Sequence, residues 1–111
     1  TTDGTQTELK IDDAGSKYLT LASGTTHNYV IYITARDTSG NSASYKIEAL
    51  AKNNGGTTTA PYINTSTLYE DVAGWDVTAV ADNGNDRLAV KVTGAAATII
   101  RWMANVMETI I

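Results

Sequence analysis

The stretch "KVTGAAATIIRWMANVMETII" (residues 91–111) decides the fold class, because its apolar residues fit two different periods. At helical spacing, Ile99, Met103, Val106 and Ile110 form one stripe. At a period of two, one face of a strand would instead hold Ile100, Trp102, Ala104, Val106 and Ile110. The segments that precede this stretch must decide between a helix and a strand.

Composition favours an all-β domain. The 111 residues predict a single domain spanning 1–111, and the start at Thr1 rather than Met suggests a C-terminal fragment of a longer protein. With 42% apolar and 18% charged residues the chain has the composition of a globular domain, and β-branched Thr is abundant. The net charge of −4 gives no electrostatic basis for binding nucleic acid or inserting into an anionic membrane. Cysteine is absent, which excludes disulfides and thiol catalysis.

The clearest secondary-structure signal is a hairpin in the first half of the chain. In "HNYVIYITARD" (27–37), alternate positions from Tyr29 to Ala35 are apolar, and the opposite face is also bulky. We therefore expect a central strand that is covered on both sides or whose second face meets another subunit. The turn "DTSGNSA" (37–43) leads to "SYKIEALAK" (44–52), which places Tyr45, Ile47, Ala49 and Ala51 on the core side.

The remaining segments continue the same pattern. Short strands are predicted at "TQTELKI" (5–11), with Thr7, Leu9 and Ile11 on one side and Glu8 and Lys10 on the other, and at "KYLTL" (17–21). "NNGGTTTAP" (53–61) is predicted to be a loop, "YINTSTLYED" (62–71) a weak strand, and "GWDVTAVA" (74–81) and "RLAVKVTG" (87–94) two further strands. About eight strands joined by frequent turns predict an antiparallel, jelly-roll-like β-sandwich.

This context favours the strand interpretation for residues 98–108. No capping pattern starts a helix after Gly94, and the run is rich in strand formers. The even-numbered face should then fill the core. Met103, Met107 and Ile111 lie on the other face and need a partner surface.

No motif in the sequence predicts catalysis, a cofactor or a metal. His27 is the only histidine, and no Gly-x-Ser-x-Gly or His-Glu-x-x-His pattern accompanies it, so we expect a structural residue at a strand end. "DNGND" (82–86) lacks the ligand order of a calcium loop and is expected to be a plain hairpin turn. The carboxylate pairs at 12–13 and 70–71 are expected to be solvated loop charges rather than a glycosidase pair.

Two sets of residues are candidates for binding. Tyr62 and Tyr69 lie in the weak strand beside the polar loop and are the aromatic residues most expected to be exposed, where they could stack on a sugar ring. Arg101 lies between Ile100 and Trp102 and is expected to pack its stem on an aromatic face or pair with an acid at a subunit seam. Together with Met103 and Met107 it forms the candidate subunit interface.

The segments "ARDTSGNSASYKIEALAKNNGG" (35–56) and "GWDVTAVADNGNDRLAVKVTGAAATIIRWMANVME" (74–108) resemble a C-terminal β-sandwich module of tailed-bacteriophage virion proteins, notably tail fibres and spikes. The likeness covers about residues 27–108 and is most specific in the closing "TIIRWMANV" (98–106). One departure is "GAAAT" (94–98), where such modules commonly have a second Gly.

The resemblance implies a non-enzymatic virion domain that forms a homotrimer and binds a host-surface glycan or protein beside other virion proteins. A capsid decoration or head-fibre domain is one alternative, and a carbohydrate-binding module attached to an enzyme is another. The first two predict a homo-oligomer, whereas the third predicts a monomer with exposed aromatic residues.

Overall fold

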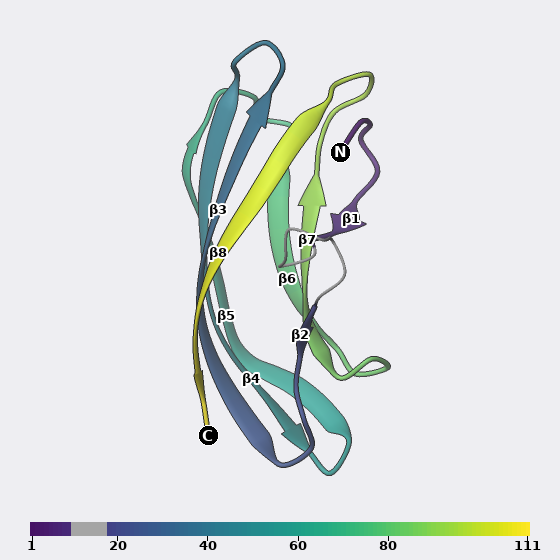
Figure 1. The fold of residues 1–111 in the computed structure, drawn as a ribbon, viewed down its shortest axis with the longest axis vertical. Helices are drawn as coiled ribbons and strands as arrows, with labels where there is room; N and C mark the ends of the chain where they lie inside the picture. Colours follow the sequence, from purple (N-terminus) through teal and green to yellow (C-terminus); the bar gives the residue numbers. More distant parts are fainter. Residues whose placement is uncertain (10–17) are drawn as a thin grey trace.

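The computed structural model describes residues 1–9 and 18–111 and contains only β-strands and their connections in that part of the chain (Figure 1). The strands are β1 (Thr7–Glu8), β2 (Leu19–Thr20), β3 (Thr25–Asp37), β4 (Ser42–Asn54), β5 (Thr57–Glu70), β6 (Asp76–Asp82), β7 (Arg87–Thr93) and β8 (Ile100–Ile110). Every pairing between them is antiparallel. The predicted all-β fold with about eight antiparallel strands is confirmed.

The larger sheet has the strand order β5-β4-β3-β8. Its centre is the hairpin of β3 and β4, whose 13-residue strands stay in register from Thr25 opposite Asn53 to Arg36 opposite Ser42. The turn between them is held by Asp37, whose carboxylate accepts hydrogen bonds from the backbone N–H groups of Ser39 and Asn41, both at 2.9 Å. Gly40 has a φ of 89°, a conformation that glycine adopts without strain.

The smaller sheet is built around β7. β6 pairs with β7 along its whole length, from Asp76 opposite Thr93 to Asp82 opposite Arg87. The two-residue strands β1 and β2 pair with different ends of β7. Glu8 in β1 lies opposite Lys91, whereas Thr7 lies opposite the core residue Val92, so the two occupy opposite faces as predicted. Glu8 is half-buried there, because it receives a hydrogen bond from Arg87 at 2.9 Å. Residues 10–17, which include the predicted end of the first strand and the Asp12-Asp13 pair, lie outside the described residues.

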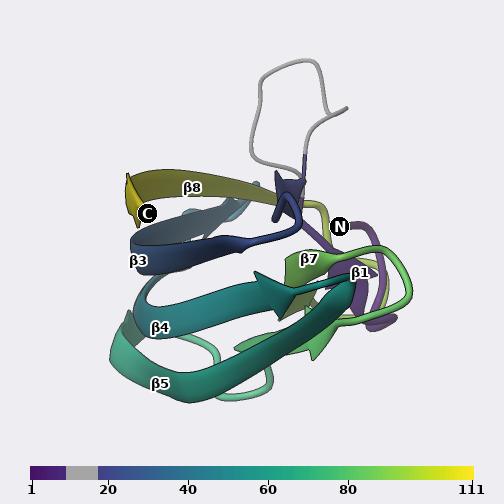
Figure 2. The same cartoon turned by 90° about the horizontal axis from the view of Figure 1, so that it is seen from below.

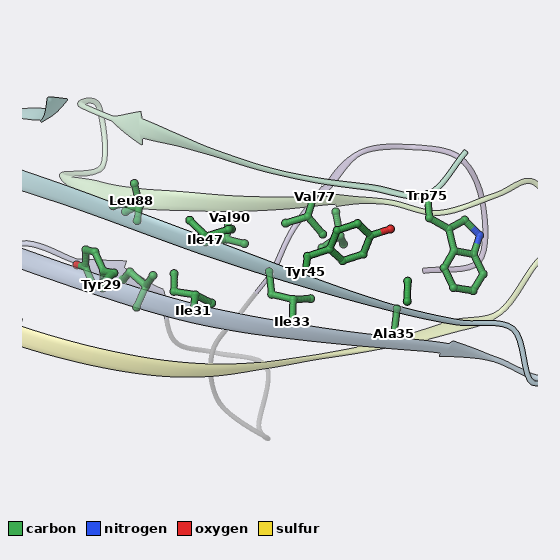
Figure 3. Packing of buried hydrophobic residues seen from close by; sticks show 14 of the residues in the cluster. Tyr29, Ile31, Ile33, Ala35, Tyr45, Ile47, Trp75, Val77, Leu88 and Val90 are labelled. Atoms are coloured by element: carbon green, nitrogen blue, oxygen red, sulfur yellow. The ribbon is translucent and has the colours of Figure 1, made fainter. Parts of the chain in front are cut away.

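The core lies between the two sheets, an arrangement compatible with a β-sandwich (Figures 2 and 3). Alternate residues of β3 and β4 point inward and are buried, including Ile31, Ile33 and Ile47, as their alternation predicted. The smaller sheet contributes Val77 and Leu88 to the same cluster. The described residues include no helix long and apolar enough to cross a membrane.

The closing stretch forms a strand, as predicted. β8 pairs with β3 without interruption from Ile100 opposite Asp37 to Ile110 opposite His27. Its even face meets the core at Ile100, which is buried, and at Trp102, which is half-buried. The prediction that this face fills the core fails at Ile110, which is 52% exposed. The smaller sheet does not extend to that end of β8 (Figure 1).

The predicted loop over residues 53–61 is wrong, because most of it belongs to β4 and β5. The connection shrinks to Gly55 and Gly56, both with positive φ, and β5 begins at Thr57. Side-chain hydrogen bonds explain why such polar residues pack. Asn53 donates from Nδ2 to the Leu21 carbonyl at 3.0 Å, and Thr58 donates from its backbone N–H to Asn83 Oδ1 at 2.7 Å.

Candidate functional site

The outer face of the larger sheet is the candidate functional surface. We define it as the side chains of β3, β4, β5 and β8 that point away from the smaller sheet. No described element covers this face, and Figure 2, which looks along the strands, shows that side of the sheet open. Its exposed large apolar side chains are those of Tyr32, Tyr62, Tyr69, Met103 and Met107. The bulky second face of β3 is therefore uncovered by the described residues of the chain.

A shallow hollow of about 740 Å³ opens on this face between β3 and β8. We call it the β3–β8 hollow, and the residues that matter for its chemistry are Tyr32, Arg36, Ile99, Arg101, Met103 and Asn105. The hollow exists because β3 and β8 are neighbours, so alternate outward side chains of both strands line it.

Two arginines face each other in the β3–β8 hollow. Arg36 and Arg101 are direct cross-strand partners, and both are exposed. Neither forms an ion pair with an acid among residues 1–9 and 18–111. Like charges directly opposite each other on a sheet are unfavourable, so a bound anion would relieve their repulsion. Guanidinium groups bind carboxylate and phosphate through paired hydrogen bonds.

The two predicted ligand-binding tyrosines lie elsewhere on the outer face. Tyr62 and Tyr69 are exposed, at 55% and 58%. Both belong to β5, the strand at the opposite edge of the sheet from β8. At about 3.3 Å per strand residue their rings are roughly 20 Å apart, so they do not form one stacking platform. The Tyr69 hydroxyl hydrogen-bonds to Asp71, which raises the pKa of Tyr69 and lowers that of Asp71. Their role in ligand binding stays a prediction.

The predicted interface residues are brought together on β8. Arg101, Met103 and Met107 all belong to the outer face, and the two methionines are 62% and 61% exposed. Arg101 points away from the side of β8 on which Trp102 packs, since adjacent strand residues face opposite ways. Exposed methionines on one strand suit a contact with another molecule, because they adapt to irregular surfaces.

His27 is buried in a hydrogen-bonded group at one end of the core. Its Nε2 contacts Thr25 Oγ1 at 3.0 Å, and its Nδ1 contacts the Tyr29 hydroxyl at 3.2 Å and Glu108 at 3.6 Å. Only 4% of His27 is exposed. Both ring nitrogens therefore already have partners, which fits the predicted structural role at a strand end.

The remaining carboxylates hold turns and strand ends. Asp82 accepts from the backbone N–H of Asn85 at 3.2 Å, so residues 82–86 form the predicted hairpin turn. Glu70 accepts from the Tyr45 hydroxyl at 2.8 Å, so it is not the solvated loop charge that was predicted. Within the two described ranges, no three His, Asp or Glu residues are placed to hold a metal ion.

Sequence reasoning missed Arg36 and Tyr32 as members of the site. The bulky side chains on the second face of residues 27–37 could have indicated a binding surface there. Only the pairing of β3 with β8, however, shows that Arg36 lies beside Arg101. Comparisons of the chain with protein-family models, with curated proteins and with solved structures find no match.

Proposed function

We propose that the chain is a non-enzymatic structural domain of a bacteriophage virion, a tail-fibre or spike module that assembles with further copies and binds a host-surface glycan or protein. The open outer face with the β3–β8 hollow is the observation that carries this proposal. A large exposed surface of mixed aromatic, methionine and arginine side chains is typical of a recognition surface. The resemblance of residues 27–108 to virion modules supplies the biological setting.

The paired arginines select the chemistry of the ligand. Arg36 and Arg101 would bind a carboxylate or phosphate group, and the ring of Tyr32 would pack against the adjoining apolar part of the ligand. Acidic polysaccharides of bacterial surfaces present this combination of groups. The homotrimer implied by the resemblance and the absence of enzymatic activity both stay predictions.

A carbohydrate-binding module is the second candidate function, favoured by the exposure of Tyr62 and Tyr69 on one face. Their separation suits an extended neutral chain that touches both rings better than it suits a single sugar. A capsid decoration or head-fibre domain would use the same outer face against a shell protein.

The test measures binding of the 111-residue protein to immobilised bacterial polysaccharides, one set bearing uronic acid or phosphate and one set neutral. We expect binding to the acidic set only, and we expect the R36A/R101A double variant to lose at least about tenfold in affinity, since each charged hydrogen bond contributes about 1.5 kcal/mol or more. Lys52→Ala, which removes a cation from the outer face at the other end of β4, is the matched control. Equal binding to neutral chains, lost in Y62A/Y69A but kept in R36A/R101A, would instead support the carbohydrate-binding module.

A further inference from the structure

The free edge of β8 has unpaired backbone groups at alternate residues. Ile111 and Thr26 exchange both backbone hydrogen bonds, at 2.8 and 2.9 Å, so odd-numbered residues along β8 direct their N–H and C=O groups toward β3. Even-numbered residues direct theirs away from the sheet. Ile100 confirms this alternation, because its outward groups are bonded to Thr1. No other described residue forms a backbone bond to this edge, which leaves the outward groups of Trp102, Ala104, Val106, Glu108 and Ile110 available.

The other edge of the larger sheet differs. The even-numbered residues of β4 direct their backbone groups toward β5, as the bond of 3.0 Å from the Asp71 N–H to the Ser42 carbonyl shows. Pro61 and Thr65 of β5 do not lie opposite even-numbered residues of β4, so their backbone nitrogens point away from the sheet. Pro61 has no N–H to offer, and the pairing of β5 with β4 is irregular at two places, between Ser44 and Tyr45 and between Leu50 and Lys52. Proline and bulges are the features by which sheet edges avoid pairing with other chains.

β8 has none of these protections. Its pairing with β3 has no irregularity over Ile100–Ile110, and the segment from 102 to 110 contains no proline, no lysine and one charged residue, Glu108. A long regular edge strand of this kind is a template for another strand. Since the β5 edge is blunted, a head-to-tail ring that joins β8 to the β5 edge of a neighbour is disfavoured. An isologous contact of β8 with itself needs no second edge.

We propose that β8 pairs antiparallel with β8 of a second copy of this chain, about a twofold axis through Val106. The available residues 102–110 are centred on Val106, so this register uses every free outward group. Trp102 would lie opposite the partner's Ile110, and Ala104 opposite the partner's Glu108, with about ten new backbone hydrogen bonds in total. A register centred on Asn105 would place Ile100 opposite the partner's Ile110, where Thr1 already bonds its edge.

The same register covers the exposed apolar side chains of β8. Ile110, which is 52% exposed, would pack beside the indole of the partner's Trp102. On the outer face, Met103 and the partner's Met107 would be diagonal neighbours across the seam. The twofold axis is perpendicular to the sheet, so both β3–β8 hollows open on one continuous face. They would be separated by about 25 Å along the strand direction, which allows one polymer to engage both.

This pairing does not rest on the proposed function, and it forms a dimer rather than a trimer. The test measures molar mass by light scattering over a range of concentrations, together with amide hydrogen exchange. We expect twice 11.8 kDa, and slow exchange at Ala104, Val106 and Glu108, whose amides bond to none of residues 1–9 and 18–111 of the same chain. A mass of 11.8 kDa at all concentrations, or of three copies, would overturn the proposal.

Edge variants make the test specific. Ala104→Pro removes an outward N–H and leaves the backbone bonds to β3 in place. Met107→Lys places a charge at the contact between the two copies of β8. Each variant should halve the molar mass measured by light scattering. Thr65→Pro removes an outward N–H from the β5 edge and should leave the mass unchanged. Circular dichroism checks that each variant is folded. If Ala104→Pro does not fold, the molar mass of Met107→Lys tests the proposed pairing of β8 with β8. A folded Met107→Lys protein with the mass of the dimer would contradict the proposed seam.

Discussion

Thr1 and Ile100 exchange both of their backbone hydrogen bonds, each at 2.8 Å, although 99 positions separate them in the sequence. The Thr1 hydroxyl also accepts a hydrogen bond from the indole Nε1–H of Trp102 at 3.0 Å. Thr1 thus occupies the start of the β8 edge. Gly94 lies beneath this contact, because a Cβ there would meet Thr1 Oγ1 and come within 3.0 Å of the Asp3 carbonyl oxygen.

Gly94→Ala should therefore detach the first residues from β8. One neighbour of the added methyl is backbone, which cannot move aside without breaking the Thr1–Ile100 pair, and we expect a loss of about 1–3 kcal/mol in the free energy of unfolding. Chemical denaturation measures the loss, and faster amide exchange at Ile100 would locate it. Gly74→Ala is the control, since a Cβ there meets nothing within 4 Å and should change stability by less than about 0.5 kcal/mol. Equal losses in the two variants would contradict the assignment.

Ala97→Gly should stabilise the protein. Ala97 has a φ of 53°, in the left-handed region that side chains disfavour, and it is exposed, so its methyl group contributes no core contact. Glycine relieves the strain at this position but also makes the unfolded chain more flexible, which partly offsets the gain. The net effect should be a rise of about 0.5–1 kcal/mol in the free energy of unfolding.

Ala96→Gly separates relief of strain from a general effect of glycine in this connection. Ala96 is also exposed but has no positive φ, so the same change should lower stability. Thermal melts of the two variants beside the parent protein measure both signs. If both variants lose stability, the connection does not hold Ala97 in the left-handed conformation.

The sequence predicted most of the fold where the information is local. Alternation marks Ile31, Ile33 and Ile47 as core residues, and the strand formers around Trp102 favour a strand, because side chains along a strand point to opposite faces. Residues 53–61 were misread because their composition is that of a loop. Asn53 and Thr58 are buried only because Leu21 and Asn83, which are distant in sequence, supply their hydrogen bonds.

The site was less predictable for the same reason. Arg101, Met103 and Met107 follow from the surplus apolar face of one strand, and the outer face does contain them. Arg36 joins Arg101 only through the pairing of β3 with β8, which links segments more than 60 residues apart. No local sequence pattern predicts which strands become neighbours, or which of the two sheet edges stays able to pair with another strand.

Stability should fall as the pH rises above about 10. Burial, assisted by Glu108, raises the pKa of Tyr29 well above its usual 10.0, and burial with Glu70 does the same for Tyr45. The unfolded chain then loses these protons first, so it binds fewer protons than the folded chain, and unfolding becomes easier as the pH rises. Tyr29→Phe should cost about 1 kcal/mol near neutral pH, through its lost hydrogen bond to His27, yet show a shallower decline above pH 10. Denaturation at several alkaline pH values tests this, and parallel declines in the two proteins would argue against it.

Acid should weaken the β3–β4 turn through Asp37. Its hydrogen bond from the Asn41 side chain, followed by those from backbone N–H groups, lowers the pKa of Asp37 below the usual 3.8. A depressed folded pKa means that the ionised carboxylate stabilises the native state above the unfolded value, and that this stability is lost as the pH falls through the folded value. Asp37→Ala should therefore lower stability at neutral pH and flatten its fall below about pH 4. Asp3→Ala is the control, because Asp3 accepts only a local bond from the Thr5 N–H. An acid limb as steep in Asp37→Ala as in the parent protein would assign the loss to Asp71 and Asp82, whose pKa values are also lowered by hydrogen bonds.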